Sequence, residues 1–430
     1  MFHSTNHKAE KVSFRKAVLN GLAEDNGLYY PDYIPKLSPT VIKNLGNMSL
    51  PEIGFLFLQP YVGHELHPSV LKDILDDALN FEIPVKQLSE SEYVLELFHG
   101  PTMAFKDVGA RTMARFLSAF NQKDETTVLV ATSGDTGGAV ANGFYNVPGV
   151  RVVVLYPKGK VSYIQEKQFT TLGNNIEAVA VEGTFDDCQH MVKAAFSDKE
   201  IKKRLVLTSA NSINIARLLP QSIYYFYAFG KLQNKDNSPV AFSVPSGNYG
   251  NLTAGLIAKK TGLPINKFIA SSNINKVVKD FLDTGKFIPR PSISTISNAM
   301  DVGNPSNFFR ILEMFENDLE QIKIDVVSYS FSDDQTRNAI KEYYRKYDYL
   351  MDPHGAVAWL GMNKYKEHNP NSNGVFLETA HPAKFKNVVE DIIKEEISLP
   401  EKLRKNISKQ QHIIKMKNSF NELKAFLLSR

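Results

Sequence analysis

From residue 93 onward, short apolar runs alternate with helical patterns along this chain. The run at 150–156 (VRVVVLY) is continuous, as in a strand that is buried on both faces. A second apolar run precedes it at 128–131, and a Gly-rich turn and a helical pattern lie between the two. This order is typical of a βαβ unit, whose strands are parallel.

The alternation continues through the following residues. Strands are expected at 176–181, 204–208, 240–244, 267–271, 325–330 and 375–378, and helices at 162–172, 185–196, 213–231 and 252–260. We therefore expect an α/β fold with open, mostly parallel sheets covered by helices. Ligands of such folds bind outside the carboxyl ends of the strands, so loops that follow strands are the candidate sites.

The pattern of predicted helices and strands divides the chain into four parts. Residues 1–92 are helix-rich and predict an N-terminal helical layer, 93–165 a smaller α/β domain, 166–390 a larger one, and 391–430 a basic helical tail. Pro and Gly residues within 275–320 predict a linking segment there.

The composition excludes several classes of protein. A chain of 430 residues with 43% hydrophobic side chains and a net charge of +4 is globular, and it carries no general basic field for nucleic acid. No signal peptide and no charge-free run of about 18 residues is present, so we expect no membrane span. A cytoplasmic location fits this pattern, and the lack of a sustained heptad seam favours a monomer.

Metal chemistry has no support in the sequence. The single cysteine, Cys188, excludes an intramolecular disulfide and a thiolate metal site, and it fits a reducing compartment. His64 and His67 are one residue too close for the H-E-x-x-H zinc motif. We expect no metal site.

The first candidate loop is 246–251 (SGNYGN), which follows an expected strand and directly precedes an expected helix. Free backbone N–H groups and the helix dipole converge at such a position and favour an anion. The loop matches neither the Walker nor the G-x-G-x-x-G spacing. By itself it is equally a phosphate site or a structural turn.

Two further loops carry reactive groups. The loop at 132–138 (TSGDTGG) offers hydroxyl and backbone donors to a carboxylate, although Asp135 is equally suited to cap a helix. In the segment 99–107 (HGPTMAFKD), Lys106 follows two apolar residues. A lysine in partly apolar surroundings can have a lowered pKa and act as a Schiff-base nucleophile, whereas most lysines are simply solvated cations.

Together the three loops indicate a cofactor. A reactive lysine, a carboxylate loop and a phosphate cradle on one α/β sheet are what a pyridoxal phosphate enzyme needs for its aldehyde, its amino-acid substrate and its cofactor phosphate.

Longer motifs extend this inference to a family. They are HGPTMAFKD (99–107), ATSGDTGGA (131–139), LYPKGKVSYIQEKQ (155–168), TSANSINIARLLPQ (208–221), SVPSGNYGN (243–251), DPHGAVA (352–358) and ETAHPAKF (378–385). In these segments and in its N-terminal pattern the sequence resembles the threonine synthases, within the fold type II pyridoxal phosphate enzymes. The likeness covers nearly the whole chain. It departs from the usual pattern at Asn6, Asn26 and Met103.

The resemblance implies roles for particular residues. Lys106 would be the catalytic residue and hold the cofactor covalently, Thr379 would bind the pyridine nitrogen, and the cofactor phosphate would be bound by Gly247, Asn248, Tyr249 and Asn251. The residues expected at the substrate are Thr132, Ser133, Asp135, Thr136, Lys160, Ser212, Asn214 and Arg217. His354 and His381 would lie near the site.

The resemblance also implies a reaction. Its substrate would be O-phospho-L-homoserine, a small molecule, and its products L-threonine and phosphate, formed by γ-elimination and β-addition of water in the last step of threonine biosynthesis. Another fold type II lyase reaction, such as threonine or serine dehydration, is the alternative.

Overall fold

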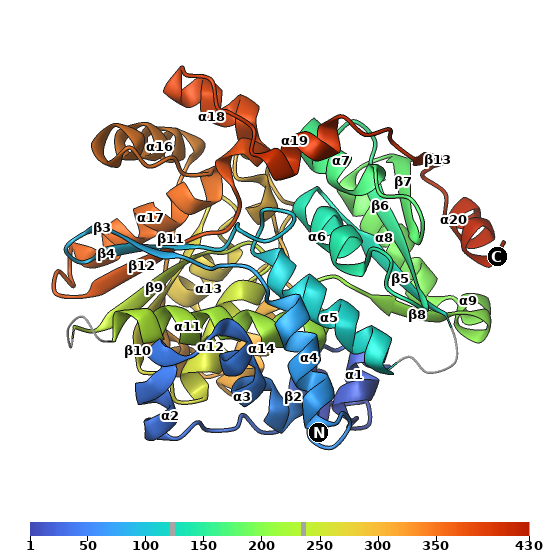
Figure 1. Cartoon of the computed structure of the whole chain (residues 1–430), viewed down its shortest axis with the longest axis horizontal. Helices are drawn as coiled ribbons and strands as arrows, with labels where there is room; N and C mark the ends of the chain where they lie inside the picture. The colour runs from blue at the N-terminus through green and yellow to red at the C-terminus, as the bar shows by residue number, and fades with distance from the viewer. Residues whose placement is uncertain (121–124, 234–237, 430) are drawn as a thin grey trace.

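The computed structural model describes residues 1–120, 125–233 and 238–429, and it confirms an α/β architecture with two large, mostly parallel sheets. Figure 1 shows the larger sheet on the left, the smaller sheet on the right and the N-terminal helices below them. The larger sheet is ordered β11 (Val326–Ser330), β10 (Ile265–Ser272), β9 (Val240–Pro245), β12 (Asn373–Glu378), β4 (Glu92–Glu96) and β3 (Val85–Ser89). Only β3 pairs antiparallel in it.

The smaller sheet is entirely parallel. Its order is β13 (Ile413–Lys417), β7 (Ile176–Glu182), β6 (Val150–Pro157), β5 (Thr126–Ala131) and β8 (Val206–Ser209). Its central strand β6 is the apolar run predicted above, and every residue of it is buried. Each fully buried Val there contributes about 1.5–3 kcal/mol of hydrophobic stabilisation.

Helices cover both sheets. Against the smaller sheet lie α6 (Asp135–Phe144), α7 (Tyr163–Thr170), α8 (Phe185–Ser197), α9 (Lys199–Arg204) and α20 (Phe420–Leu428). Against the larger sheet lie α12 (Gly250–Lys260), α13 (Val277–Thr284), α15 (Leu319–Asp325) and α17 (Pro353–Lys366). Around them lie α14 (Phe308–Met314), α16 (Asp333–Tyr347), α18 (Lys386–Ile393) and α19 (Glu401–Ile407). Helix α5 (Lys106–Phe120) packs against α6 of the smaller sheet and against the N-terminal helix α4.

The predicted N-terminal layer is present. It contains α1 (Phe14–Asn20), α2 (Pro39–Asn44), α3 (Leu50–Val62), α4 (Pro68–Ala78) and a small sheet of β1 (Phe2–Ser4) and β2 (Tyr29–Pro31). Helix α3 begins with a capping box in which Ser49 and Glu52 bond each other's backbone N–H groups. It packs against α11 (Ile223–Leu232), with the Phe57 and Phe226 rings 5.4 Å apart.

The structure differs from the predicted boundaries in two places. Strands β7 and β8 belong to the smaller sheet, so the boundary between residues 165 and 166 does not separate the two sheets. The tail is not only helical, because β13 extends the smaller sheet by pairing with β7. Met416 is the buried residue of β13. Because the pairing of β13 with β7 joins segments far apart in the chain, the sequence of β13 itself shows little strand pattern.

Two other segments also differ from the prediction. The helix expected at 213–231 is divided into α10 (Ile215–Leu218), a 3-10 turn and α11, because Pro220 cannot continue an α-helix. The expected linking segment 275–320 contains two α-helices, and its 3-10 turn η3 (Asn298–Met300) contacts a candidate loop, as described below. No helix in the described ranges is both long enough and apolar enough to cross a bilayer.

Candidate active site

The segments that carry Lys106 and Thr379 lie side by side, although 273 positions separate the two residues in the chain. The parallel strands β4 and β12 pair in register up to Glu96 and Glu378, so the segments after them leave the same sheet edge. There Phe105 N donates to Thr379 O at 2.9 Å, and His381 N donates to Met103 O at 3.1 Å. These two bonds hold the turn that carries Lys106 against the segment that carries Thr379.

The surroundings of Lys106 favour a reactive amine. Its side chain is only partly exposed, and Nζ lies 4.7 Å from the centre of the Phe105 ring. Burial, together with the positive charges of Lys384 and Arg217, lowers the pKa of Lys106 to about 8, although the negative charge of Asp135 raises it. Protonated and neutral amine therefore coexist near neutral pH.

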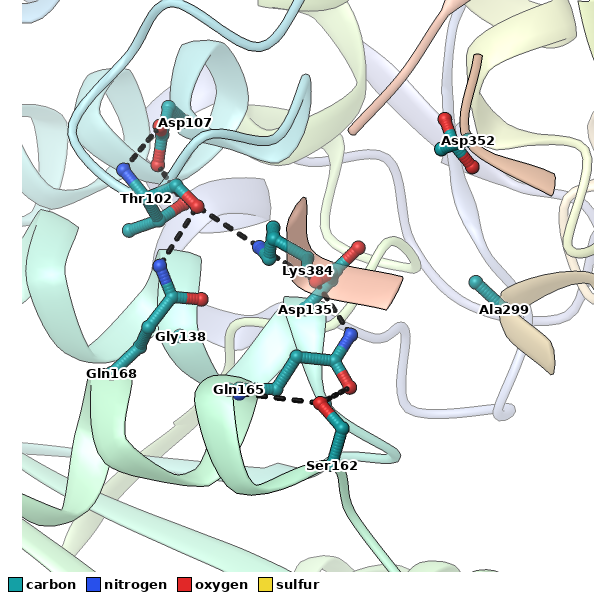
Figure 2. Close-up of polar contacts among 12 residues, drawn as sticks. Thr102, Asp107, Asp135, Gly138, Ser162, Gln165, Gln168, Ala299, Asp352 and Lys384 are labelled. Atoms are coloured by element: carbon teal, nitrogen blue, oxygen red, sulfur yellow. Dashed lines mark hydrogen bonds and ion pairs between the residues drawn. The ribbon is translucent and has the colours of Figure 1, made fainter. Parts of the chain in front are cut away.

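A buried ion pair stands beside this lysine. Lys384 Nζ lies 2.7 Å from Asp135 Oδ1 and donates to Thr102 O at 2.9 Å, and Gln165 Nε2 donates to the same Asp135 oxygen at 2.8 Å. Figure 2 shows Lys384 between Thr102 and Asp135. Burial alone would raise the pKa of Asp135, but the charges of Lys384 and Lys106 hold it well below its usual range.

The loop 132–138 is therefore only partly available to a ligand. Asp135 is paired with Lys384, a residue of the ETAHPAKF motif to which the sequence analysis assigned no role. Thr132 is buried, and its hydroxyl accepts from Gly134 N at 2.9 Å and Gly137 N at 2.8 Å, so it stabilises the turn. Ser133 and Thr136 are half-buried and keep accessible surface.

The loop 246–251 has the cradle geometry expected of an anion site. It connects β9 to α12, and Tyr249 adopts a left-handed conformation (φ 60°) directly before the helix. Asn251 Oδ1 accepts from Tyr224 and Tyr225 at 2.5 and 2.6 Å, whereas its buried Nδ2 has no hydrogen-bond partner in the described part of the chain. An unpaired buried donor is costly unless a ligand accepts from it.

Side chains from other segments fix this loop. Asn248 Nδ2 donates to Ser212 Oγ at 2.6 Å, and Asn248 Oδ1 accepts from Ser306 N at 2.7 Å. Arg310, which no sequence motif indicated, is fully buried and donates to Ser212 O at 3.4 Å and Tyr29 O at 3.0 Å. Arg310 thus links the N-terminal layer to this loop, a contact that no local pattern could reveal.

The remaining predicted substrate residues divide into three cases. Asn214 caps α10, and its amide donates to Val18 O at 3.0 Å and Ser209 O at 3.1 Å, so the fold occupies its polar atoms. Arg217 is buried and donates to Ala210 O, and its Nε has no hydrogen-bond partner among the described residues. Lys160 is exposed in the loop after β6.

The two histidines take different positions. His354 is buried and contacts Asp352. His381 Nδ1 accepts from Ala383 N at 3.1 Å, and burial lowers the pKa of His381 to about 4, so His381 is neutral near pH 7.

Comparison with known families matches nearly the whole chain. The profile described as pyridoxal-phosphate dependent enzyme covers residues 82–379, that of the threonine synthase N terminus covers 1–79, and that of the threonine synthase C-terminal region covers 355–427. The threonine synthase of Buchnera aphidicola from Acyrthosiphon pisum is 44% identical over all of both chains. That of Escherichia coli K12 is 45% identical over 92% of this chain and 91% of its own. The chain belongs to the threonine synthase family.

Solved structures agree with this assignment. The crystal structure of threonine synthase from Escherichia coli superimposes with a TM-score of 0.93 at 42% identity, over 100% of this chain and 99% of that one. A structure described as PLP bound threonine synthase from Brucella melitensis has a TM-score of 0.93 at 33% identity, over 99% and 98%. A tomato threonine deaminase, with a TM-score of 0.55 at 17% identity, shares the fold alone.

Family membership makes this chain a pyridoxal-phosphate-dependent lyase. The site fits that cofactor, because Lys106 supplies an amine whose pKa is lowered by burial and Asn251 supplies an unpaired buried donor in the expected phosphate cradle. The predicted cofactor and fold class are thus confirmed.

Proposed function

We propose that this enzyme converts O-phospho-L-homoserine and water to L-threonine and phosphate. The observation that carries the proposal is the placement of Lys106: its turn is bonded to Thr379, and its amine, with a pKa lowered to about 8 by burial, lies within reach of the charges of Asp135 and Arg217. The threonine synthase relatives, which match over the full length, support the same reaction.

The cofactor would be held at three points. Lys106 would bind its aldehyde carbon, the Thr379 hydroxyl its pyridine nitrogen, and the loop of Gly247, Asn248, Tyr249 and Asn251 its phosphate. When bound, pyridoxal phosphate withdraws electrons from the carbon atoms of an attached amino acid and so makes their protons more acidic.

Lys106 would then move the protons of the reaction. An amine with a pKa of about 8 is a competent base and a competent acid near neutral pH, since both of its forms are populated. We propose that Lys106 Nζ takes the protons from Cα and Cβ of the substrate, returns a proton at Cγ after phosphate has left, and returns the last proton at Cα.

The substrate would be oriented by its two anionic ends. Ser133 and Thr136, whose side chains keep accessible surface, are proposed to bind the carboxylate. For the phosphate we propose Arg217, whose Nε is buried without a partner among the described residues, together with Ser212 and Lys160. The polar atoms of Thr132, Asp135 and Asn214 are engaged by the fold, so we propose that these residues shape the site.

The reaction balances without a further reactant. Protons leave Cα and Cβ, the Cγ–O bond breaks, and phosphate leaves with its bonding pair. A proton is then added at Cγ, water adds its oxygen at Cβ, and a proton returns to Cα. We propose that the expelled phosphate, held by Arg217, takes the proton from this water. A guanidinium is suited to holding phosphate by two hydrogen bonds.

The experiment that tests the function is a product assay. Purified enzyme is incubated with O-phospho-L-homoserine, and inorganic phosphate and threonine are quantified together. We expect equal amounts of both, and neither with Lys106→Ala. Phosphate without threonine would show an elimination that ends in an oxo acid and would contradict the proposal, as would the absence of both products.

We also propose that the enzyme is a cytoplasmic monomer. The single cysteine fits a reducing compartment and supports the location. The absence of a sustained heptad pattern in the sequence supports the monomer. Light scattering coupled to size exclusion should give the mass of one chain, and twice that mass would contradict it.

A further inference from the structure

Two carboxyl groups, Asp352 and Glu378, meet in the interior beside the site. Neither residue has exposed surface, and Asp352 N donates to Glu378 Oε1 at 2.5 Å. One oxygen of each, Asp352 Oδ2 and Glu378 Oε2, has no hydrogen-bond partner in the described part of the chain. Two ionised carboxylates this close would repel each other strongly, so one of them must carry a proton.

Glu378 is the residue that carries this proton. Burial raises the pKa of Glu378 well above its usual range, and repulsion by Asp352 and Glu96 acts in the same direction. The charge of Glu96 is itself compensated, because Lys86 and His99 lie 2.9 and 2.7 Å from its two oxygens. A protonated Glu378 is a donor as well as an acceptor, and it can donate to Asp352.

Asp352 in turn fixes the orientation of His354. Asp352 Oδ1 accepts from His354 Nδ1 at 2.5 Å, and His354 Nε2 accepts from Ala299 N at 3.2 Å. A backbone N–H can only donate, so Nε2 is the unprotonated nitrogen and Nδ1 carries the hydrogen. His354 is therefore a neutral connector between the carboxylate and the backbone at Ala299.

The backbone at Ala299 lies against the cofactor-phosphate loop. A Cβ atom added to Gly247 would lie 2.8 Å from Ala299 O and 2.7 Å from Met300 Cα, so the turn η3 and this loop are in direct contact. Figure 2 shows Asp352 and Ala299 on the right, apart from the Asp135 and Lys384 pair near the centre. A displacement of η3 would therefore remove the backbone that packs against Gly247.

We propose that Glu378, Asp352 and His354 form a hydrogen-bonded support that holds η3 against Gly247 and thereby keeps the phosphate loop in its binding geometry. Glu378 acts in it as a neutral donor and Asp352 as the acceptor. All three are positioning residues. The inference rests on the proposed assignment of the loop at Gly247 to the cofactor phosphate, and it adds that Glu378, which directly precedes Thr379, connects the two ends of the cofactor site.

Paired substitutions of Glu378 test the support. Glu378→Gln keeps a neutral donor of the same shape, and Glu378→Leu removes the donor. Apo protein is titrated with pyridoxal phosphate, and the dissociation constant is read from the cofactor absorbance, next to urea unfolding of the apo protein. We expect Glu378→Gln to bind within about threefold of wild type and Glu378→Leu to bind at least about tenfold more weakly, since the buried Asp352 N–H then loses its acceptor, Glu378 Oε1.

Glu92→Leu is the matched control. Glu92 is a buried carboxyl at the opposite end of the same strand pair, where it accepts from Tyr343 and Trp359 at 2.8 and 2.9 Å. Its loss should lower the free energy of unfolding and leave the cofactor affinity unchanged. Equal weakening by Glu378→Gln and Glu378→Leu would overturn the proposal, because an ionised Glu378 would then be required.

A second measurement reads the hydrogen bond itself. In apo protein with nitrogen-15 histidine, the Nδ1 proton of His354 should resonate far downfield, persist in Glu378→Gln and vanish in Asp352→Ala. A proton on Nε2 of His354 instead would overturn the proposal. Wild-type protein that fails to bind pyridoxal phosphate would overturn the cofactor assignment, whereas normal binding by Glu378→Leu would overturn only the support.

Discussion

Replacing Arg217 by Met should shift the pH at which the apo protein captures pyridoxal phosphate. Only the neutral amine of Lys106 attacks the aldehyde, so the capture rate should rise with pH and reach half of its maximum at about pH 8. An amine of this pKa is about one quarter neutral at pH 7.5, whereas a lysine with the ordinary value of 10.5 is about 0.1% neutral.

The charge of Arg217 is one of the causes that lower this pKa, so its removal should raise the midpoint. A rise on the order of one unit would reduce the neutral fraction at pH 7.5 roughly eightfold. The double variant Asp135→Asn, Lys384→Met is the control, because Asp135 raises the pKa of Lys106 and Lys384 lowers it. Its midpoint should lie close to that of the wild type.

The assay is stopped-flow absorbance of apo protein mixed with pyridoxal phosphate between pH 6.5 and 10. The titration of the free cofactor is common to all variants, so differences between them report the lysine. Lys106→Ala should show no covalent capture. A wild-type midpoint near 10, or an Arg217→Met midpoint below that of the wild type, would refute the reasoning.

Three further outcomes are expected. Asp135→Asn should lower the free energy of unfolding by about 3–5 kcal/mol in urea titrations, since it leaves the buried, charged Lys384 without its acidic partner. Adding Lys384→Met as a second substitution should restore most of this loss. Equal stability of the single variant and the wild type would contradict the prediction. Gly355→Ala should destabilise the fold by at least about 1–3 kcal/mol and weaken cofactor binding, because the added Cβ would lie 1.4 Å from Glu378 Oε2; unchanged thermal unfolding would show that this contact can relax. Asn251→Ala should raise the dissociation constant of pyridoxal phosphate about tenfold, since Nδ2 is the unpaired donor of the cradle, and an unchanged constant would remove Asn251 from the phosphate site.

The sequence by itself determined where the reactive loops begin. A buried strand followed by a Gly-rich turn and a helix is a local pattern, so 132–138 and 246–251 could be placed between strand and helix without any tertiary information. The three loops together likewise indicated the cofactor, and the long motifs along the chain indicated the family; the comparisons confirmed both.

Only the tertiary structure decided what those side chains contact. Asp135 is equally suited to a ligand or a helix cap by its local sequence, and the partner that engages it, Lys384, lies 249 positions away. Asn214 could have faced a phosphate, but Val18 from the N-terminal layer accepts from its amide.

The contacts that support the phosphate loop could not be predicted from the sequence either. Asp352 and His354 lie at the start of α17 and Glu378 at the end of β12, and they meet η3 only because the larger sheet has folded with α17 against β12. Strand and helix patterns follow from the side chains of neighbouring residues, whereas hydrogen bonds and ion pairs between distant segments depend on where the whole chain places their backbones. For this reason the reactive residues could be predicted from the sequence, whereas the ion pairs and hydrogen bonds that surround them could not.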